Sequence, residues 1–169
     1  MRKQHKKYKK PKKPFESKRI EEEDILLKQY GLKNKRELWR ASFNIEKIRN
    51  QAKKLLTASS EEQKKFLDKL VGIGLIKASS TIDDVLSLKN VNILERRLQT
   101  IVFKRGMARS AKQARQFIIH KHVIVGDRVI NIPSYIVPLG MENNIKLKIA
   151  KKLEDIRKPK KKGEEQEQK

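Results

Sequence analysis

An excess of positive charge constrains this chain more than any other feature of its sequence. The 169 residues include 43 Lys and Arg against 20 Asp and Glu, which gives a formal net charge of +23, and 37% of the residues are hydrophobic. Self-repulsion at this charge density opposes a compact state, so the sequence predicts only a modest core. A polyanion such as nucleic acid is the partner that supplies the missing negative charge.

The charge is concentrated in particular segments. Residues 1–19 carry ten basic side chains and one acidic side chain. Residues 91–137 carry nine basic and two acidic side chains, and so do residues 145–162. The first segment has almost no apolar residue before Phe15, so it cannot bury enough surface to fold alone, and we predict a basic arm that folds onto nucleic acid. Residues 150–169 are predicted to form a charged, low-complexity tail.

Residues 20–90 show a helical periodicity that predicts a mostly helical lobe. Gly31 is expected to end a first helix, and Asn34 to begin a long second helix with a basic face. Ser59 and Glu62 have the spacing of a capping box for a third helix, which we expect Gly72 to end. A short helix is predicted from Thr81 to Leu88.

The sequence of residues 91–149 predicts a second unit, in which two to three helices pack on a short β-hairpin. One continuous helix is expected from Asn90, with an apolar stripe at Leu94, Leu98, Ile101 and Val102. The next helix is expected to begin with a capping box of Ser110 and Gln113 and to bury Ala111, Ala114 and Ile118. Two strands, 123–125 and 128–130, flank a turn at Gly126 and Asp127. The fold class is therefore predicted to be α+β.

Several stretches of the second unit resemble the RNA-binding module named after small-subunit ribosomal protein four. They are 95–98, 106–110, 114–115, 123–127 and 133–137. Residues 3–14, 30–39 and 83–88 extend the resemblance to the archaeal and eukaryotic form of that ribosomal protein family. Many module relatives have glycine where this chain has Lys121, and Asn-Gly where it has Gly126 and Asp127.

The resemblance implies a structural constituent of the small ribosomal subunit. Family members bind small-subunit ribosomal RNA directly at a multi-helix junction, nucleate subunit assembly, and lie near the entrance of the messenger RNA path beside ribosomal proteins five and three. The same RNA-binding module also occurs in stress proteins and RNA-modifying enzymes. A free-standing RNA chaperone or stress factor is therefore the alternative function that the sequence leaves open.

The candidate RNA-binding residues come from the basic segments and from the resemblance. The basic arm and the helical lobe contribute Arg2, Lys3, Lys6, Lys7, Lys9, Lys10, Lys12, Lys13, Arg36, Arg40, Lys47, Arg49 and Lys53. The second unit contributes Lys104, Arg105 and Arg128, and the resemblance implies an RNA face of Arg96, Arg97, Arg109, Lys112, Arg115, Gln116, His120 and Lys121. Arginine can bind phosphate through two parallel hydrogen bonds, whereas lysine adds a point charge.

Nothing in the sequence favours catalysis. The chain has no cysteine, and the pair His120 and His122 offers too few ligands for zinc, so we expect no metal, no cofactor and no small-molecule substrate. Acidic runs such as Asp83 and Asp84 fall in the first turns of predicted helices, where the helix dipole stabilises negatively charged side chains. No apolar run is long enough for a membrane span, so we expect a cytoplasmic protein. The resemblance implies that it is bound to the ribosome, and the lack of a catalytic constellation predicts that it is not an enzyme.

Overall fold

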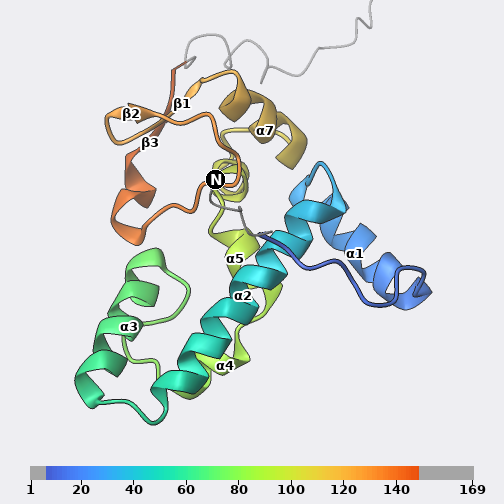
Figure 1. Cartoon of the computed structure of the whole chain (residues 1–169). Helices are drawn as coiled ribbons and strands as arrows, with labels where there is room; N and C mark the ends of the chain where they lie inside the picture. The colour runs from blue at the N-terminus through green and yellow to red at the C-terminus, as the bar shows by residue number, and fades with distance from the viewer. Residues whose placement is uncertain (1–6, 149–169) are drawn as a thin grey trace, which may run out of the picture.

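The computed structural model describes residues 7–148, and its chain begins with helices that form a first lobe (Figure 1). This lobe contains α1 (Ser17–Tyr30), α2 (Lys35–Leu55), α3 (Ser60–Ile73), α4 (Ile82–Ser87) and α5 (Asn90–Glu95). The second lobe contains α6 (Leu98–Lys104), α7 (Ala111–Ile119), β1 (Val123–Val125), β2 (Arg128–Val129), the 3-10 helix η1 (Leu139–Asn144) and β3 (Ile145–Leu147). The α+β prediction is confirmed. The predicted tail lies outside the described residues.

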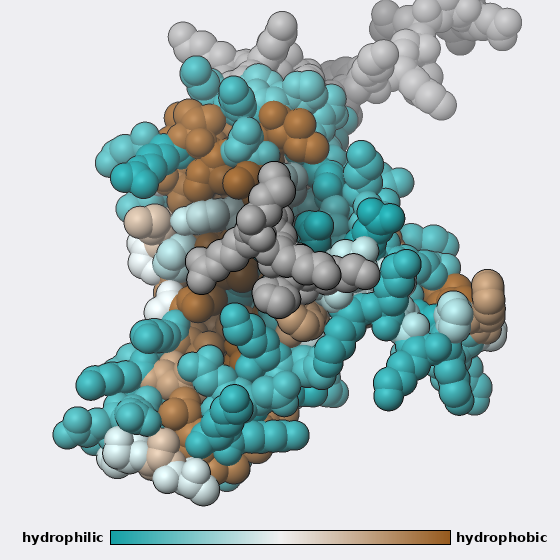
Figure 2. All heavy atoms as spheres, in the orientation of Figure 1, coloured by the Kyte–Doolittle hydropathy of each residue, from teal (hydrophilic) through white to brown (hydrophobic). Residues whose placement is uncertain are grey.

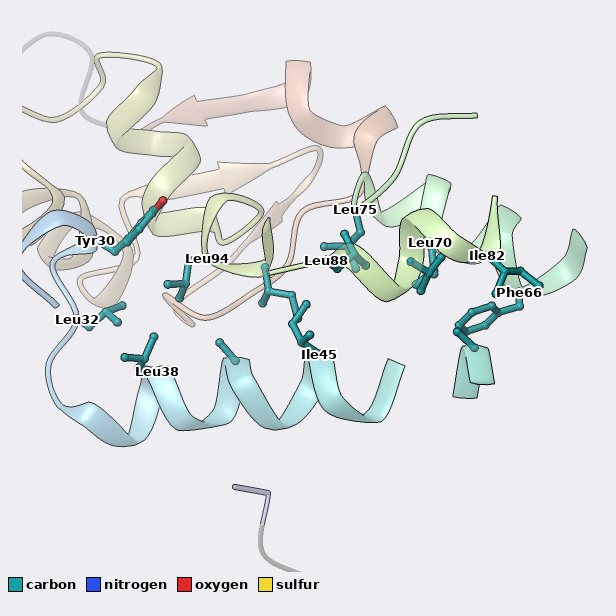
Figure 3. Packing of buried hydrophobic residues seen from close by; sticks show 14 residues of the cluster. Tyr30, Leu32, Leu38, Ile45, Phe66, Leu70, Leu75, Ile82, Leu88 and Leu94 are labelled. Carbon is teal, nitrogen blue, oxygen red and sulfur yellow. The ribbon is translucent and has the colours of Figure 1, made fainter. Parts of the chain in front are cut away.

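The long helix α2 forms one side of the first lobe's core. Leu38, Ile45 and Ala52 recur at helical spacing and are buried against α4 and α5, because one apolar stripe of a helix must face other apolar surface. Figure 3 shows Leu38 and Ile45 on α2 facing Leu94 and Leu88. Burying a side chain the size of Leu38 or Ile45 contributes roughly 1.5–3 kcal/mol, so α2 is held in place and positions the side chains on its exposed face.

The expected single helix from Asn90 is wrong, because the chain breaks at Arg96 and Arg97. Arg97 is extended, with φ −71° and ψ 141°, and its backbone pairs with that of Ile136. The Leu98 N–H donates to the Tyr135 carbonyl at 2.7 Å, and the Val137 N–H donates to the Arg96 carbonyl at 3.1 Å. A segment about forty residues later in the chain thus replaces the helical hydrogen bonds. The apolar stripe continues through the break, so periodicity could not reveal it.

The predicted hairpin is present, and a third strand extends it. β1 pairs antiparallel with β2 on one side and with β3 on the other, in the order β2-β1-β3. Gly126 has φ 60° in the two-residue turn, the position where a type II′ turn needs glycine. The core of the second lobe lies between the sheet and the two helices, with Leu98, Val102, Ile118 and Val123 among its buried residues.

The ends of α3 differ from the prediction, whereas α7 begins at the predicted cap residue, Ser110. Ser59 makes no side-chain cap, so the expected capping box with Glu62 is absent, and Gly74, not Gly72, ends α3 with φ 79°. Ser110 caps α7 by accepting a hydrogen bond from the Gln113 N–H at 3.2 Å. The Gln113 side chain accepts from the Arg109 N–H at 2.7 Å and not from the Ser110 N–H, so the reciprocal bond of the predicted capping box is absent.

Lys121 follows α7 in the left-handed region at φ 61°. The His122 N–H donates to the Phe117 carbonyl and the Lys121 N–H to the Ile118 carbonyl, which is the Schellman pattern. This conformation favours glycine, so lysine forms the same turn at a conformational cost.

Candidate nucleic-acid interface

Most of the candidate RNA-binding side chains in the described residues are exposed. They are Lys7, Lys9, Lys10, Lys12, Lys13, Arg36, Arg40, Lys47, Lys53, Lys104, Arg109, Lys112, Gln116, His120, Lys121 and Arg128. Arg2, Lys3 and Lys6 lie outside the described residues. Figure 2 shows hydrophilic residues gathered over α1 and the lower part of the first lobe, and apolar residues showing through in the second lobe. Cations therefore face solvent on the arm and on both lobes.

The basic arm contacts the first lobe. The Tyr8 ring stacks on that of Trp39, with centroids 6.2 Å apart, and the Lys9 Nζ lies 2.6 Å from a carboxylate oxygen of Glu46 on α2. The Arg19 guanidinium donates to the carbonyls of Lys13 and Pro14, at 3.0 Å each. An exposed ion pair alone contributes little, but together these contacts hold residues 7–14 against the helices.

One carboxylate joins the two lobes. Glu37, in the first turn of α2, accepts a hydrogen bond from Arg97 Nη2 at 2.5 Å. It also accepts two from Arg115 on α7, at 2.8 Å from Nη2 and 3.2 Å from Nη1. The Arg97 side chain is only 6% exposed, and that of Glu37 14%. Burial by itself would raise the pKa of Glu37, but the hydrogen bonds and charges of Arg115 and Arg97 outweigh it, so this pKa lies below its ordinary value.

A buried amide makes a second connection between the lobes. Gln99 on α6 donates from Nε2 to the carbonyls of Tyr30 and Gly31, at 3.2 and 2.9 Å, and to that of Ala111 at 2.9 Å. The turn between α1 and α2 thereby lies against the start of α7. Gly31 has φ 59°, and a Cβ there would lie 2.8 Å from that of Ala111, so only glycine fits this contact. The two lobes are therefore packed directly on each other.

Several predicted RNA-binding arginines bind other parts of the protein. Arg96 donates to the Ile73 and Val137 carbonyls, at 3.1 and 2.8 Å, and its Nη1 lies 3.0 Å from Glu142. Arg49 donates to the Leu88 carbonyl, and Arg105 donates to the Asn143 side chain at 3.0 Å. Like Arg97 and Arg115, these side chains are at least half buried. Their RNA contacts stay predictions, and their contacts within the fold give them a structural role.

Comparison with known proteins identifies the family. The S4 domain matches residues 96–143. The small ribosomal subunit protein uS4 of Methanoregula boonei is 45% identical over 152 residues, which cover 85% of this chain and 82% of the relative. The chain belongs to the uS4 family. The uS4 protein of Picrophilus torridus is 46% identical over 149 residues, covering 84% and 81% of the two chains, and that of Methanospirillum hungatei is 47% identical over 154, covering 85% and 84%.

Membership in the uS4 family confirms the resemblance read from the sequence. The S4 domain match begins at Arg96, where α5 ends, and spans α6, α7, β1 and β2. Proteins of the uS4 family are structural ribosomal proteins with an RNA-binding domain, so the prediction that the chain is not an enzyme is also confirmed.

No cation-binding cluster or membrane span accompanies this uS4 fold within residues 7–148. In that range no three His, Cys, Asp or Glu side chains come together as metal ligands. The rings of His120 and His122 stack on each other, with centroids 6.2 Å apart. None of the helices in the same range is both long enough and apolar enough to cross a membrane.

Sequence reasoning missed two of the residues that join the lobes of this uS4 protein, Glu37 and Gln99. Glu37 is one acid among the basic residues that begin α2, and a first-turn carboxylate reads as a helix-dipole partner. Gln99 stands inside the apolar stripe of α6, and a polar residue at a core position was the signal available for it. Its three carbonyl partners come from segments that only the tertiary structure brings together.

Proposed function

We propose that this chain is a structural constituent of the small ribosomal subunit that binds small-subunit ribosomal RNA directly at a multi-helix junction. The observation that carries the proposal is that exposed cations lie on both lobes, while Glu37 and Gln99 fix those lobes to each other. A rigid pair of basic surfaces fits a folded RNA, which is recognised by its shape and its phosphates more than by base edges.

The four parts of the chain have different roles in this proposal. Residues 1–19 act as an RNA-contacting arm, 20–90 as a helical RNA-binding lobe, 91–149 as the RNA-binding module and 150–169 as a charged tail. Early binding at the junction would nucleate subunit assembly, because it fixes several RNA helices at once. Ribosomal proteins five and three, and messenger RNA at the entrance of its path, are the proposed neighbours, and the protein works on the cytoplasmic ribosome.

The salt dependence of RNA affinity tests the direct contact. Each neutralised phosphate is expected to contribute about 0.7 to 0.9 to the slope of log affinity against log salt. The variant R36Q/K47Q/K53Q, which removes three exposed cations from α2, should lower this slope by roughly 2 to 3 units for in vitro transcribed small-subunit ribosomal RNA. The control K64Q/K65Q/K69Q removes three exposed cations from α3 that are not among the candidate RNA-binding residues, and it should change the slope far less.

Stoichiometry on ribosomal particles separates the two functions that the sequence leaves open. A structural constituent should sediment with small subunits at one copy each, whereas an RNA chaperone should be present in substoichiometric amounts. Finding most of the protein away from small subunits at physiological salt, or equal slopes for the α2 and α3 variants, would contradict the proposal.

A further inference from the structure

A pocket of about 180 Å³ lies between the two lobes. Its lining includes Arg40 and Asn44 from α2, and Arg97, Arg115 and Ser134 from the second lobe, with the ion-paired Glu37. Its volume is several times what one water molecule needs. Three guanidinium groups against one carboxylate leave two positive charges on its walls.

The pocket has more hydrogen-bond donors than the protein uses. The Arg40 side chain is exposed and makes no ion pair or hydrogen bond with residues 7–148, and the Ser134 hydroxyl is likewise without a partner in that range. Arg97 is buried, yet of its three nitrogens only Nη2 has a partner in the described chain, and its Nε is buried without one. Nε has no accessible surface, so Nη1, which has neither a partner in residues 7–148 nor full burial, is the Arg97 donor that an acceptor in the pocket can reach. An unmade hydrogen bond of a charged group costs about 1–3 kcal/mol, so such an acceptor would stabilise this arrangement.

We propose that this pocket binds one phosphate group, which accepts hydrogen bonds from the Arg40 and Arg97 guanidinium groups and from the Ser134 hydroxyl. The group comes either from the RNA backbone, which rests on the function proposed above, or from free phosphate in solution. Guanidinium groups match the oxygens of phosphate in pairs, and a partly enclosed site strengthens each bond. The phosphate would thus contact both lobes at the place where they meet.

The chemistry of the lining favours phosphate over a nucleobase. No aromatic side chain lines the pocket as the described residues form it, so it offers no surface on which a base could stack. Glu37 does not oppose an anion strongly, because both of its carboxylate oxygens already accept hydrogen bonds from Arg97 and Arg115. Those bonds also hold the Arg97 guanidinium in place at the pocket wall.

Two variants of the full chain test the site without removing a buried group. R40Q should weaken binding to in vitro transcribed small-subunit ribosomal RNA about tenfold and lower the salt slope by about 0.7 to 0.9, since one phosphate contact is lost. S134A changes no charge and should weaken affinity by a smaller factor with the slope unchanged. The matched control K64Q, an exposed cation on α3, should change affinity by less than about twofold.

A spectroscopic readout separates this inference from the proposed function. The Nε–H signal of Arg97 in the wild-type protein is followed while ribosomal RNA, or inorganic phosphate alone, is added. If RNA shifts the Arg97 signal and R40Q abolishes that shift, the pocket binds a phosphate of the RNA. If inorganic phosphate shifts the signal but RNA does not bind the protein, the pocket is a free-anion site and the proposed function fails. RNA binding with no shift from either ligand, or R40Q behaving as K64Q, overturns the phosphate pocket and leaves the proposed function standing. No response to either ligand overturns both.

Discussion

Glu37 accepts hydrogen bonds from two arginines of the other lobe, Arg97 and Arg115. This one carboxylate therefore gives both arginines a structural role in joining the lobes. From the sequence, the resemblance places Arg97 and Arg115 on the RNA face together with exposed cations such as Arg109. In the structure Arg97 and Arg115 are ion-paired to the same carboxylate, and removing one partner leaves buried charge without compensation. Their substitution would therefore disturb the lobes as well as any RNA contact, and it is a poor test of RNA binding alone.

E37Q should lower the free energy of unfolding by about 3 kcal/mol at neutral pH, because it leaves two guanidinium groups without their countercharge. Since the folded-state pKa of Glu37 lies below its ordinary value, the stabilisation is complete above that ordinary value and is lost as the pH falls through the folded-state pKa. Urea unfolding at stepwise lower pH should show this loss in the wild type and not in E37Q. The exposed pair of Glu46 and Lys9 supplies the control, since E46Q should cost less than about 1 kcal/mol; equal effects of the two variants would contradict this role.

At the scale of elements, apolar periodicity determines where the helices form. Contacts with segments distant in the sequence determine where some of them end. The long helix α2 and the cap at Ser110 agree with the prediction, because both depend on residues within one or two turns. The break between α5 and α6 and the strand β3 were not predictable in the same way. Both are stabilised by backbone pairing with segments distant in sequence, 133–137 for the break and β1 for β3.

Two glycines should respond to the same substitution in opposite directions. G31A places a Cβ 2.8 Å from that of Ala111 in a left-handed backbone, so it should destabilise the protein by about 2–4 kcal/mol. G72A lies inside α3 with open space around it and should stabilise the protein by roughly 0.5–1 kcal/mol through helix propensity. Denaturant midpoints measure both, and a harmless G31A would mean that α1, α2 and α7 do not approach as closely as described.

At the scale of the whole molecule, two hydrophobic clusters meet at polar contacts. One cluster extends from Tyr30 to Leu94 and the other from Leu98 to Ile145. Between them, Glu37, Gln99 and Arg96 provide directional bonds, and the large apolar side chains pack mainly within each lobe. The relative position of the basic surfaces thus depends on a few hydrogen bonds, which makes the stability of one lobe depend on the other.

Q99E should uncouple the lobes, because it replaces the donor that three buried carbonyls share with an acceptor. We expect a loss of at least about 2 kcal/mol and, in place of one unfolding transition, separate transitions for Trp39 fluorescence and for the amide signals of β1. Q113E is the matched control, since this side chain accepts a hydrogen bond from the Arg109 N–H and a carboxylate can do the same. A single transition in Q99E would show that the lobes are coupled by other contacts.

The sequence by itself determined the helical first lobe, the hairpin of the second lobe, the family and the demand for a polyanion. The lobe, the hairpin and the demand for a polyanion are set by local periodicity, by turn and cap residues, and by a charge total that does not depend on conformation, whereas the family was inferred from the resemblance of particular motifs. Only the tertiary structure decided which cations face solvent and which are bound within the protein. That distinction depends on partners such as Glu37 for Arg115, 78 residues apart, and hydrogen bonds act over about 3 Å in space without regard to distance along the chain.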